Sequence, residues 1–269
     1  MPTITSLYSD FAAIFHTAFF GNAWFFGAVL NTVLAAIAVI APKKLLTPAG
    51  LFHAWILGIL IWGTLGWRGY IVVMFYFLVG SSVTRIGLAQ KQAAGIAEKR
   101  SGARGPENVW GSALIGTLCA IGTAMISLSY PENIAIQIGP LLLLGYVASF
   151  STKLSDTCAS EIGKAYGQRT FLITTLKAVP RGTEGAISLE GTLAGAIASV
   201  AIALVGWLVG LISIPGIGIC AIAAFIGTNL ESVIGATLQE KFDWLTNEVV
   251  NVLNTLIGSV SAVLIGFFL

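Results

Sequence analysis

The chain has 269 residues, of which 56% are hydrophobic and only 10% are charged, and its formal net charge is +2. Because about a quarter of the residues of a soluble domain are charged, this composition and a mean hydropathy of +0.89 exclude a water-soluble fold. The length allows about eight helices of roughly 20 apolar residues each, the number needed to cross a bilayer. We therefore expect a single integral membrane domain with membrane lipid around it and no nucleic-acid partner.

Apolar runs, taken in chain order, predict an all-α polytopic membrane protein. Residues 4–20 have the apolar character of an interfacial helix ahead of the first span. The second and third spans are separated only by a tight turn at residues 66–69, and prolines lie between other spans, where a missing N–H is tolerated. The eight predicted spans are 22–41, 49–65, 69–84, 109–128, 134–150, 190–212, 217–236 and 249–268.

Lysine and arginine residues are concentrated in alternate connections. The connections 42–48, 85–108, 151–189 and 237–248 hold 13 of the 14 basic residues, and Arg68 alone lies in the other set. Because positive charge in short loops marks the cytoplasmic side, we expect 85–108 and 151–189 to be two long polar cytoplasmic loops, with both termini on the opposite face. Their ten basic side chains favour an anionic ligand, although anionic lipid headgroups would attract the same charges.

The second loop opens with a stretch rich in charge, STKLSDTCASEIGKAYG. On a helix that continues from the preceding span, Lys153, Asp156, Glu161 and Lys164 would share roughly one side. One aspartate beside lysines suits Mg²⁺, which keeps several waters and takes one or two carboxylates plus substrate phosphates. The alternative is that Ser155 or Asp156 caps a helix that begins here. The glycine and lysine spacing does not match the Walker phosphate-binding pattern.

The end of the same loop, TTLKAVPRGTEGAISLEG, has the composition of a phosphate site. Lys177, Arg181, Thr183 and Glu184 lie around a proline and two glycines just before the next span. Fixed cations and backbone N–H groups at the start of a helix bind phosphate. Glu184 could hold the metal, or it could only stabilise the helix N-terminus through the helix dipole.

The last two spans carry polar residues that are costly in hydrocarbon. Asn229 and Glu231 lie near one end of the seventh span, and Asn247, Glu248 and Asn251 lie at the start of the eighth. Ionisable residues inside a membrane face the bundle interior and indicate function, so Glu231 is the sharper candidate. Hydrogen bonding between helices is the alternative for the asparagines.

Four segments together resemble one integral membrane family, which includes the phytyl-phosphate kinases of cyanobacteria and chloroplasts. The segments are TKLSDTCASEIGKAYG, TTLKAVPRGTEGAISLEGTLAG, NLESVIGATLQ and LTNEVVN. The resemblance covers the chain from about residue 22 to its end. The first two segments are also similar to those of phytol and dolichol kinases and, more distantly, of phosphatidate cytidylyltransferases. Those enzymes use CTP or another nucleoside triphosphate with Mg²⁺.

The resemblance implies transfer of the γ-phosphoryl group of a nucleoside triphosphate, CTP above all, to phytyl phosphate or a related prenyl phosphate. The product would be the diphosphate for tocopherol and phylloquinone synthesis. By this resemblance Asp156 is the metal-binding aspartate, and Lys177, Arg181 and Glu184 form the nucleotide-phosphate turn. Glu231 stands where more distant members have aspartate and would be a further metal ligand. The other phosphate-binding candidates are Lys153, Lys164, Thr183, Arg85 and Arg104.

Other functions stay open on the sequence alone. A free alcohol such as phytol or a polyprenol could be the acceptor, or the enzyme could act on lipid as a cytidylyltransferase does. A secondary transporter of a small ion or anion is the alternative from another class, but the charges gather at one face and no internal repeat relates the two halves. Residues 1–21 contain no Lys or Arg and predict no transit peptide, which indicates a cyanobacterial plasma or thylakoid membrane.

Overall fold

The computed structural model of the chain describes residues 22–239 and 241–269, and it confirms an all-α polytopic membrane protein. The expected interfacial helix at 4–20 lies outside the described residues. Seven of the described helices are long and apolar enough to cross a membrane. The elements are α2 (Ala23–Ile40), α3 (Pro48–Thr84), α4 (Leu88–Ala93), the short 3₁₀ helix η2 (Lys99–Gly102), α5 (Pro106–Ser129), α6 (Glu132–Tyr166), β1 (Thr170–Leu172), β2 (Ala186–Ser188), α7 (Leu189–Leu208), α8 (Ile214–Thr237) and α9 (Asn247–Phe268).

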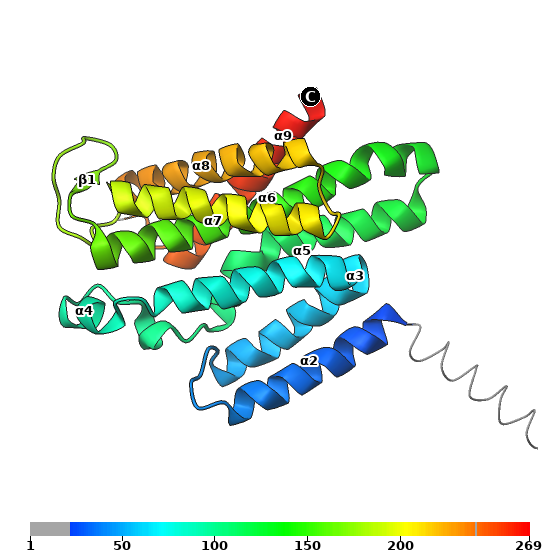
Figure 1. Ribbon diagram of the computed structural model, residues 1–269, viewed down its shortest axis with the longest axis horizontal. Helices are drawn as coiled ribbons and strands as arrows, with labels where there is room; N and C mark the ends of the chain where they lie inside the picture. Colours follow the sequence, from blue (N-terminus) through cyan, green and yellow to red (C-terminus); the bar gives the residue numbers. More distant parts are fainter. Residues whose placement is uncertain (1–21, 240) are drawn as a thin grey trace, which may run out of the picture.

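Helix α3 contains the two predicted spans 49–65 and 69–84 as two arms. Gly66 between them is not helical, with φ +62° and ψ −155°, a conformation that favours glycine. The rings of Trp62 and Tyr70 lie 5.1 Å apart across the turn, whereas eight residues along a straight helix would span about 12 Å. Figure 1 shows the second arm running back beside the first. The chain therefore makes eight passes, as the apolar runs predict.

Most of the basic residues gather at one end of the bundle. The connections between α2 and α3, α3 and α5, α6 and α7, and α8 and α9 all lie at this end, which we call the polar end (Figure 1). The turn that carries Arg68 lies at the other end, as do the connection between α5 and α6 and the C-terminus. The arrangement agrees with the division of charge that the sequence shows.

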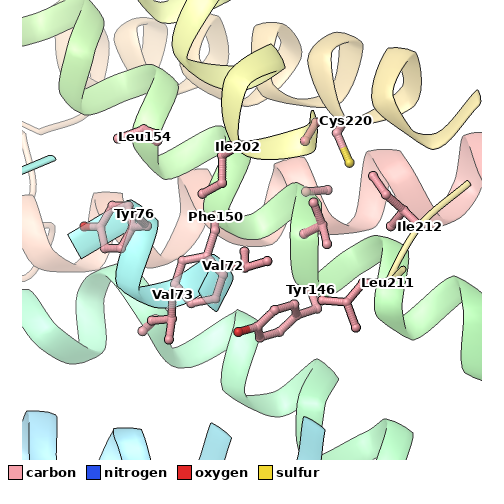
Figure 2. Close-up of a cluster of buried hydrophobic side chains, with 14 of the residues drawn as sticks. Val72, Val73, Tyr76, Tyr146, Phe150, Leu154, Ile202, Leu211, Ile212 and Cys220 are labelled. Carbon is pink, nitrogen blue, oxygen red and sulfur yellow. The ribbon is translucent and has the colours of Figure 1, made fainter. Parts of the chain in front are cut away.

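Helix α6 is the centre of the bundle. It packs against α3, α5, α7, α8 and α9, and its apolar face is fully buried at Tyr146, Phe150 and Leu154. Figure 2 shows these side chains meeting Tyr76 from α3 and Ile202 from α7. The rings of Tyr76 and Phe150 lie 5.5 Å apart and those of Tyr146 and Phe150 5.1 Å apart. This core fixes the position of the residues that follow on the same helix.

The extent predicted for the second polar loop is wrong. Helix α6 does not end near Phe150 but continues to Tyr166, so residues 151–166 are helical, and 151–156, Cys158 and Glu161 are buried inside the bundle. The interpretation of Ser155 or Asp156 as a helix cap is wrong for the same reason. Hydropathy places polar residues outside a span, but these side chains bind one another and their neighbours within the bundle. The loop proper, 167–188, forms an antiparallel hairpin of β1 and β2.

The first polar loop, 85–108, is partly helical. It contains the six-residue helix α4 and the short η2, and α5 already begins at Pro106. A short parallel bridge joins Leu46 to Arg104, and the Thr47 N–H donates to the Arg104 carbonyl at 3.0 Å. These bonds hold Arg104 against the start of α3, near the polar end of the second arm.

Candidate active site

Asp156 lies on α6 at the edge of a cavity of about 200 Å³, which we call the inner cavity. The cavity is enclosed by α6, α7, α8 and the β1–β2 hairpin. Only 6% of the Asp156 surface is exposed, so the carboxylate faces protein rather than open solvent. The polar residues that line the inner cavity are Ser155, Asp156, Ser160, Lys164, Thr170, Thr183, Glu184, Ser188, Thr192, Ser199, Thr228, Asn229, Glu231 and Ser232.

Lys153 lies one helical turn before Asp156 and binds its carboxylate. The Lys153 Nζ donates to Asp156 Oδ2 at 2.5 Å and to Asn251 Oδ1 on α9 at 2.6 Å. Both charged side chains are 9% exposed. In a setting of low dielectric such a pair is held firmly, because either charge alone would be costly to bury.

A second polar cavity of about 650 Å³, the outer cavity, lies on the Lys153 side of this pair. Lys153, Asn247, Glu248 and Asn251 line it from α6 and α9. Its other charged lining residues are Glu98, Arg100, Arg104, Glu107, Lys164 and Glu184. The inner and outer cavities share Lys164, Gly182 and Glu184. The Lys153–Asp156 pair therefore stands between two connected polar cavities at the polar end.

Carboxylates of like charge converge on the inner cavity. The Glu231 carboxyl on α8 lies close enough to Asp156, Glu184 and Lys153 to interact with their charges. Within the described residues, no three His, Cys, Asp or Glu side chains are grouped tightly enough to enclose a metal ion. Two facing carboxylates nonetheless suit Mg²⁺, which takes one or two protein carboxylates and completes its shell with water and substrate phosphates.

Glu161 has a different position from Asp156. It is 2% exposed, binds Lys91 of α4 in a buried ion pair, and has Lys164 3.9 Å away. Lys91 also donates to the Thr84 carbonyl at 2.9 Å. Glu161 lines neither polar cavity, so its contacts join α4 to α6 and orient Lys164, which does line both.

Three predicted phosphate-binding residues lie outside the two cavities. Lys177 is exposed in the β1–β2 hairpin. Arg181 is exposed and donates to the Ala165 carbonyl at 3.2 Å, and Arg85 donates to the Lys44 carbonyl at 3.3 Å. None of the three lines the inner or outer cavity. Their role in phosphate binding stays a prediction, whereas Thr183 and Glu184 from the same turn as Arg181 do reach the inner cavity.

The asparagines of the last two helices differ in their contacts. Asn251 binds Lys153, as described, and lines the outer cavity. Asn247, at the start of α9, accepts a hydrogen bond from the Gln239 side chain. Asn229 lines the inner cavity but its amide donates to the Phe225 carbonyl of its own helix at 2.7 Å. Hydrogen bonding between helices therefore describes only Asn251, which joins α9 to Lys153 on α6. Asn229 bonds within α8, and Asn247 bonds to the connection between α8 and α9.

Thr228 and Tyr76 are two side chains of the cavities that the sequence candidates did not include. Thr228 Oγ1 on α8 is buried without a hydrogen-bond partner among the described residues, and it lines the inner cavity. Tyr76 on α3 lines the outer cavity, and its hydroxyl accepts from Arg104 at 2.7 Å. The sequence signals for these two residues are weak. Thr228 is a threonine three residues before Glu231, and Tyr76 is a tyrosine between two phenylalanines in an apolar span.

Comparisons with known proteins agree on one family. A family model described as integral membrane protein DUF92 matches residues 31–259, which include every residue of the two polar cavities. An uncharacterized membrane protein of Synechocystis sp. is 64% identical over 240 residues, which cover 89% of this chain and 90% of that protein. No solved structure matches.

Two further relatives come from a plant and an archaeon. Protein VTE6, chloroplastic, of Arabidopsis thaliana is 46% identical over 247 residues, which cover 90% of this chain and 72% of that protein. An uncharacterized membrane protein of Methanocaldococcus jannaschii is 32% identical over 87% of this chain and 91% of its own length. The similarity thus extends over nearly the whole membrane bundle in each case.

Proposed function

This chain belongs to the DUF92 family of integral membrane proteins, and from that membership and its polar cavities we propose that it is a membrane phosphotransferase. The proposed reaction moves the γ-phosphoryl group of a nucleoside triphosphate, with CTP as the first candidate, to phytyl phosphate or a related prenyl phosphate. The chloroplast relative and the resemblance of the four segments to phytyl-phosphate kinases support a role in tocopherol synthesis.

One observation carries the proposal. Asp156 and Glu231 face the same cavity together with Lys164 and Thr183, and the adjoining outer cavity is large and lined by further cations. Phosphoryl transfer depends mainly on positioning and on neutralising phosphate charge, which fixed cations and a metal-binding carboxylate can do. Because the cavities lie at the polar end of a membrane bundle, a water-soluble nucleotide and the head of a lipid can meet there.

Asp156 and Glu231 are the residues that fit Mg²⁺, the metal that the family resemblance implies. Both carboxyl groups line the inner cavity, and Lys153 binds only that of Asp156, so a divalent cation would find two oxygen ligands there. Bound Mg²⁺ would neutralise charge on the nucleotide phosphates. Glu184 lines both polar cavities and is placed to supply a further oxygen ligand directly or through water.

The acceptor chemistry needs no general base. A phosphate monoester has a second pKa of about 6, so its oxygen is already anionic at neutral pH. In the proposed step this oxygen forms a bond to the γ-phosphorus while the bond from γ-phosphorus to the bridging oxygen breaks, which leaves the nucleoside diphosphate and the prenyl diphosphate. Lys153 and Lys164 are placed to hold the phosphates in line. No histidine lines either polar cavity.

Asp156→Asn tests the proposal in purified protein supplied with Mg²⁺, CTP and phytyl phosphate. We expect kcat to fall by about 100-fold or more, because the amide keeps the shape of the side chain and its acceptor for Lys153 but removes the metal-binding charge. Diphosphate formation is measured with radiolabelled acceptor. Asp243→Asn is the matched control, since Asp243 is exposed between α8 and α9 and lines no described cavity, and it should keep wild-type turnover.

Four results would contradict the proposal. Wild-type turnover by Asp156→Asn would remove Asp156 from the reaction, and turnover that persists in EDTA would remove the metal. Phosphorylation of free phytol but not of phytyl phosphate would assign the enzyme to the alcohol kinases. Ion flux in liposomes without nucleotide would favour a transporter, although Asp156 lies within a helix that continues through Tyr166 rather than at a helix break.

A further inference from the structure

A third cavity, the apolar cavity, lies between α2, α3 and α5 and has a volume of about 320 Å³. Aliphatic and aromatic side chains make up most of its lining, including Leu34, Leu51, Trp55 and Phe77. Pockets for small organic ligands usually measure about 300–1,000 Å³. The cavity therefore has the size and the surface chemistry to hold a hydrocarbon chain.

The apolar cavity opens sideways towards the surrounding lipid. Ile37 of α2 and Leu78 of α3 both line it, and they are 53% and 51% exposed. Large apolar side chains exposed on a membrane-spanning helix contact lipid tails rather than water. A hydrophobic ligand can thus enter between α2 and the second arm of α3 without leaving the membrane.

The far end of the cavity is closed by a polar pair. The Tyr70 hydroxyl donates to Asn31 Oδ1 at 2.8 Å, and the Asn31 amide donates to the Gly27 carbonyl at 2.8 Å. Along α2 the lining extends from Asn31 to Ala41, which corresponds to about 15 Å at the rise of an α-helix. The space is thus long in the direction of the membrane normal, as an extended tail requires.

The near end of the apolar cavity meets the outer cavity. Tyr76, Arg104, Asn108 and Ser112 line both. The Arg104 guanidinium donates to the Tyr76 hydroxyl at 2.7 Å and lies 5.1 Å from the centre of that ring. In the ion pairs of the described residues Arg104 has no carboxylate partner. A cation without an anionic partner therefore marks the point where apolar lining gives way to polar lining.

We propose that the apolar cavity binds the isoprenoid tail of the acceptor, with the acceptor phosphate at Arg104. This inference rests on the proposed phosphotransferase function and assigns its lipid subsite. The occupant is the acceptor rather than the acyl chain of a bilayer lipid, because the cavity leads past Arg104 into the outer cavity. That cavity contains Lys153 and shares Lys164 and Glu184 with the inner cavity. A tail bound here directs its phosphate towards Asp156.

Two substitutions on α2 separate the tail subsite from general effects on the helix. Ala38→Phe places a ring in the apolar cavity, whereas Ala36→Phe places the same ring on the exposed face two residues away. We expect Ala38→Phe to raise KM for phytyl phosphate about tenfold. The binding free energy that is lost with the burial of a few methylene groups is sufficient for a change of that size. KM for dimethylallyl phosphate, whose five-carbon tail makes only part of these contacts, should rise much less. Ala36→Phe should match the wild type with both acceptors.

Arg104→Gln tests the head of the same subsite. It should raise KM for phytyl phosphate and for dimethylallyl phosphate alike, about tenfold or more, because both acceptors carry the phosphate. Ala54→Phe, also on the cavity wall, is a second filling variant if Ala38→Phe folds poorly in detergent. Equal KM values for Ala38→Phe, Ala54→Phe and wild type would overturn the tail subsite while the phosphotransferase activity stands.

A binding measurement tests the tail subsite independently of phosphoryl transfer. A phytyl phosphate analogue with a diazirine at the tail end should crosslink to peptides of α2 and the first arm of α3, and unlabelled phytyl phosphate should compete. If wild type crosslinks in this way but phosphorylates no prenyl phosphate, the proposed function fails and the subsite stands. Crosslinking elsewhere, or equal competition by phosphatidylglycerol, would overturn the subsite and leave a bilayer lipid as the occupant.

Discussion

Two of the ion pairs among the described residues are buried and involve α6. Lys153 on α6 binds Asp156 on the same helix and Asn251 on α9, and Glu161 on α6 binds Lys91 on α4. Burial makes each charge dependent on its partner, because an unpaired charge in this environment costs several kcal/mol. The two pairs therefore have different uses: one faces the polar cavities, and the other holds the first polar connection against α6.

The Lys91–Glu161 pair gives a prediction about stability. We expect Lys91→Met to lower the free energy of unfolding by about 3–5 kcal/mol, because it leaves a buried carboxylate without its main cation. Replacing both residues by methionine should cost much less, since no unpaired charge remains. Thermal and denaturant unfolding in detergent measure both effects. A double variant as unstable as the single one would show that contacts other than the ion pair stabilise this site.

An exposed pair supplies the control for that experiment. Arg100 and Glu107 also form an ion pair, but their side chains are 45% and 41% exposed. Arg100→Met should therefore change stability by less than about 1 kcal/mol.

The sequence predicts which residue types form the candidate site, and less well where each one lies. Asp156, Glu231 and Thr183 could be chosen because charge and hydroxyls are rare in an apolar chain, and all three line the inner cavity. Lys177 and Lys153 look alike in the sequence. Only the fold separates them, since α6 carries Lys153 into the bundle while Lys177 lies in an exposed hairpin.

At the scale of elements, α6 shows which part of a helix the hydropathy pattern predicts correctly and which part it predicts wrongly as a loop. The apolar run 134–150 predicts a span, and the structure contains that helix. The polar run after it predicts a loop, because a hydropathy window cannot register that Lys153 will meet Asn251 from a helix about 100 residues later. The neighbouring helices accept this polar segment because small residues let them approach it closely.

Gly258 on α9 is the closest of these approaches. A Cβ atom added there would lie 1.9 Å from Thr152 Oγ1 on α6, which is fully buried. We expect Gly258→Ala to push α9 away from α6 and to lower stability by about 1–3 kcal/mol. Because α9 also carries Asn251, the same shift should lower phosphotransferase activity. Melting temperature in detergent and turnover measure the two effects.

Gly218 on α8 is the matched glycine for that test. A Cβ atom added there would meet nothing within 4 Å, so Gly218→Ala should be neutral or slightly stabilising, as alanine favours a helix. If Gly258→Ala were as stable and active as Gly218→Ala, close packing of α9 on α6 would not position the candidate site.

At the scale of the whole molecule, the reversal of α3 at Gly66 decides the topology. With two arms in α3 the chain makes eight passes, and every connection rich in Lys and Arg lies at the polar end (Figure 1). A single pass in place of these arms would carry Thr47, just before α3, and Arg104, which follows it, to opposite ends. The structure places both at the same end, because the Thr47 N–H donates to the Arg104 carbonyl at 3.0 Å.

The topology can be tested by labelling single cysteines in intact cells, after replacement of the three native cysteines. Trp67→Cys lies at the α3 turn, Tyr130→Cys lies between α5 and α6, and Thr175→Cys lies in the hairpin; all three positions are exposed. Because basic connections stay in the cytoplasm, an impermeant maleimide should label Trp67→Cys and Tyr130→Cys from outside. It should label Thr175→Cys only after permeabilisation, which puts the polar cavities on the cytoplasmic side with the nucleotide.

Failure of Trp67→Cys to react would place residue 67 within the membrane and contradict the reversal of α3. Labelling of Thr175→Cys alone from outside would place the candidate site on the face that lacks CTP and thereby contradict the proposed donor as well.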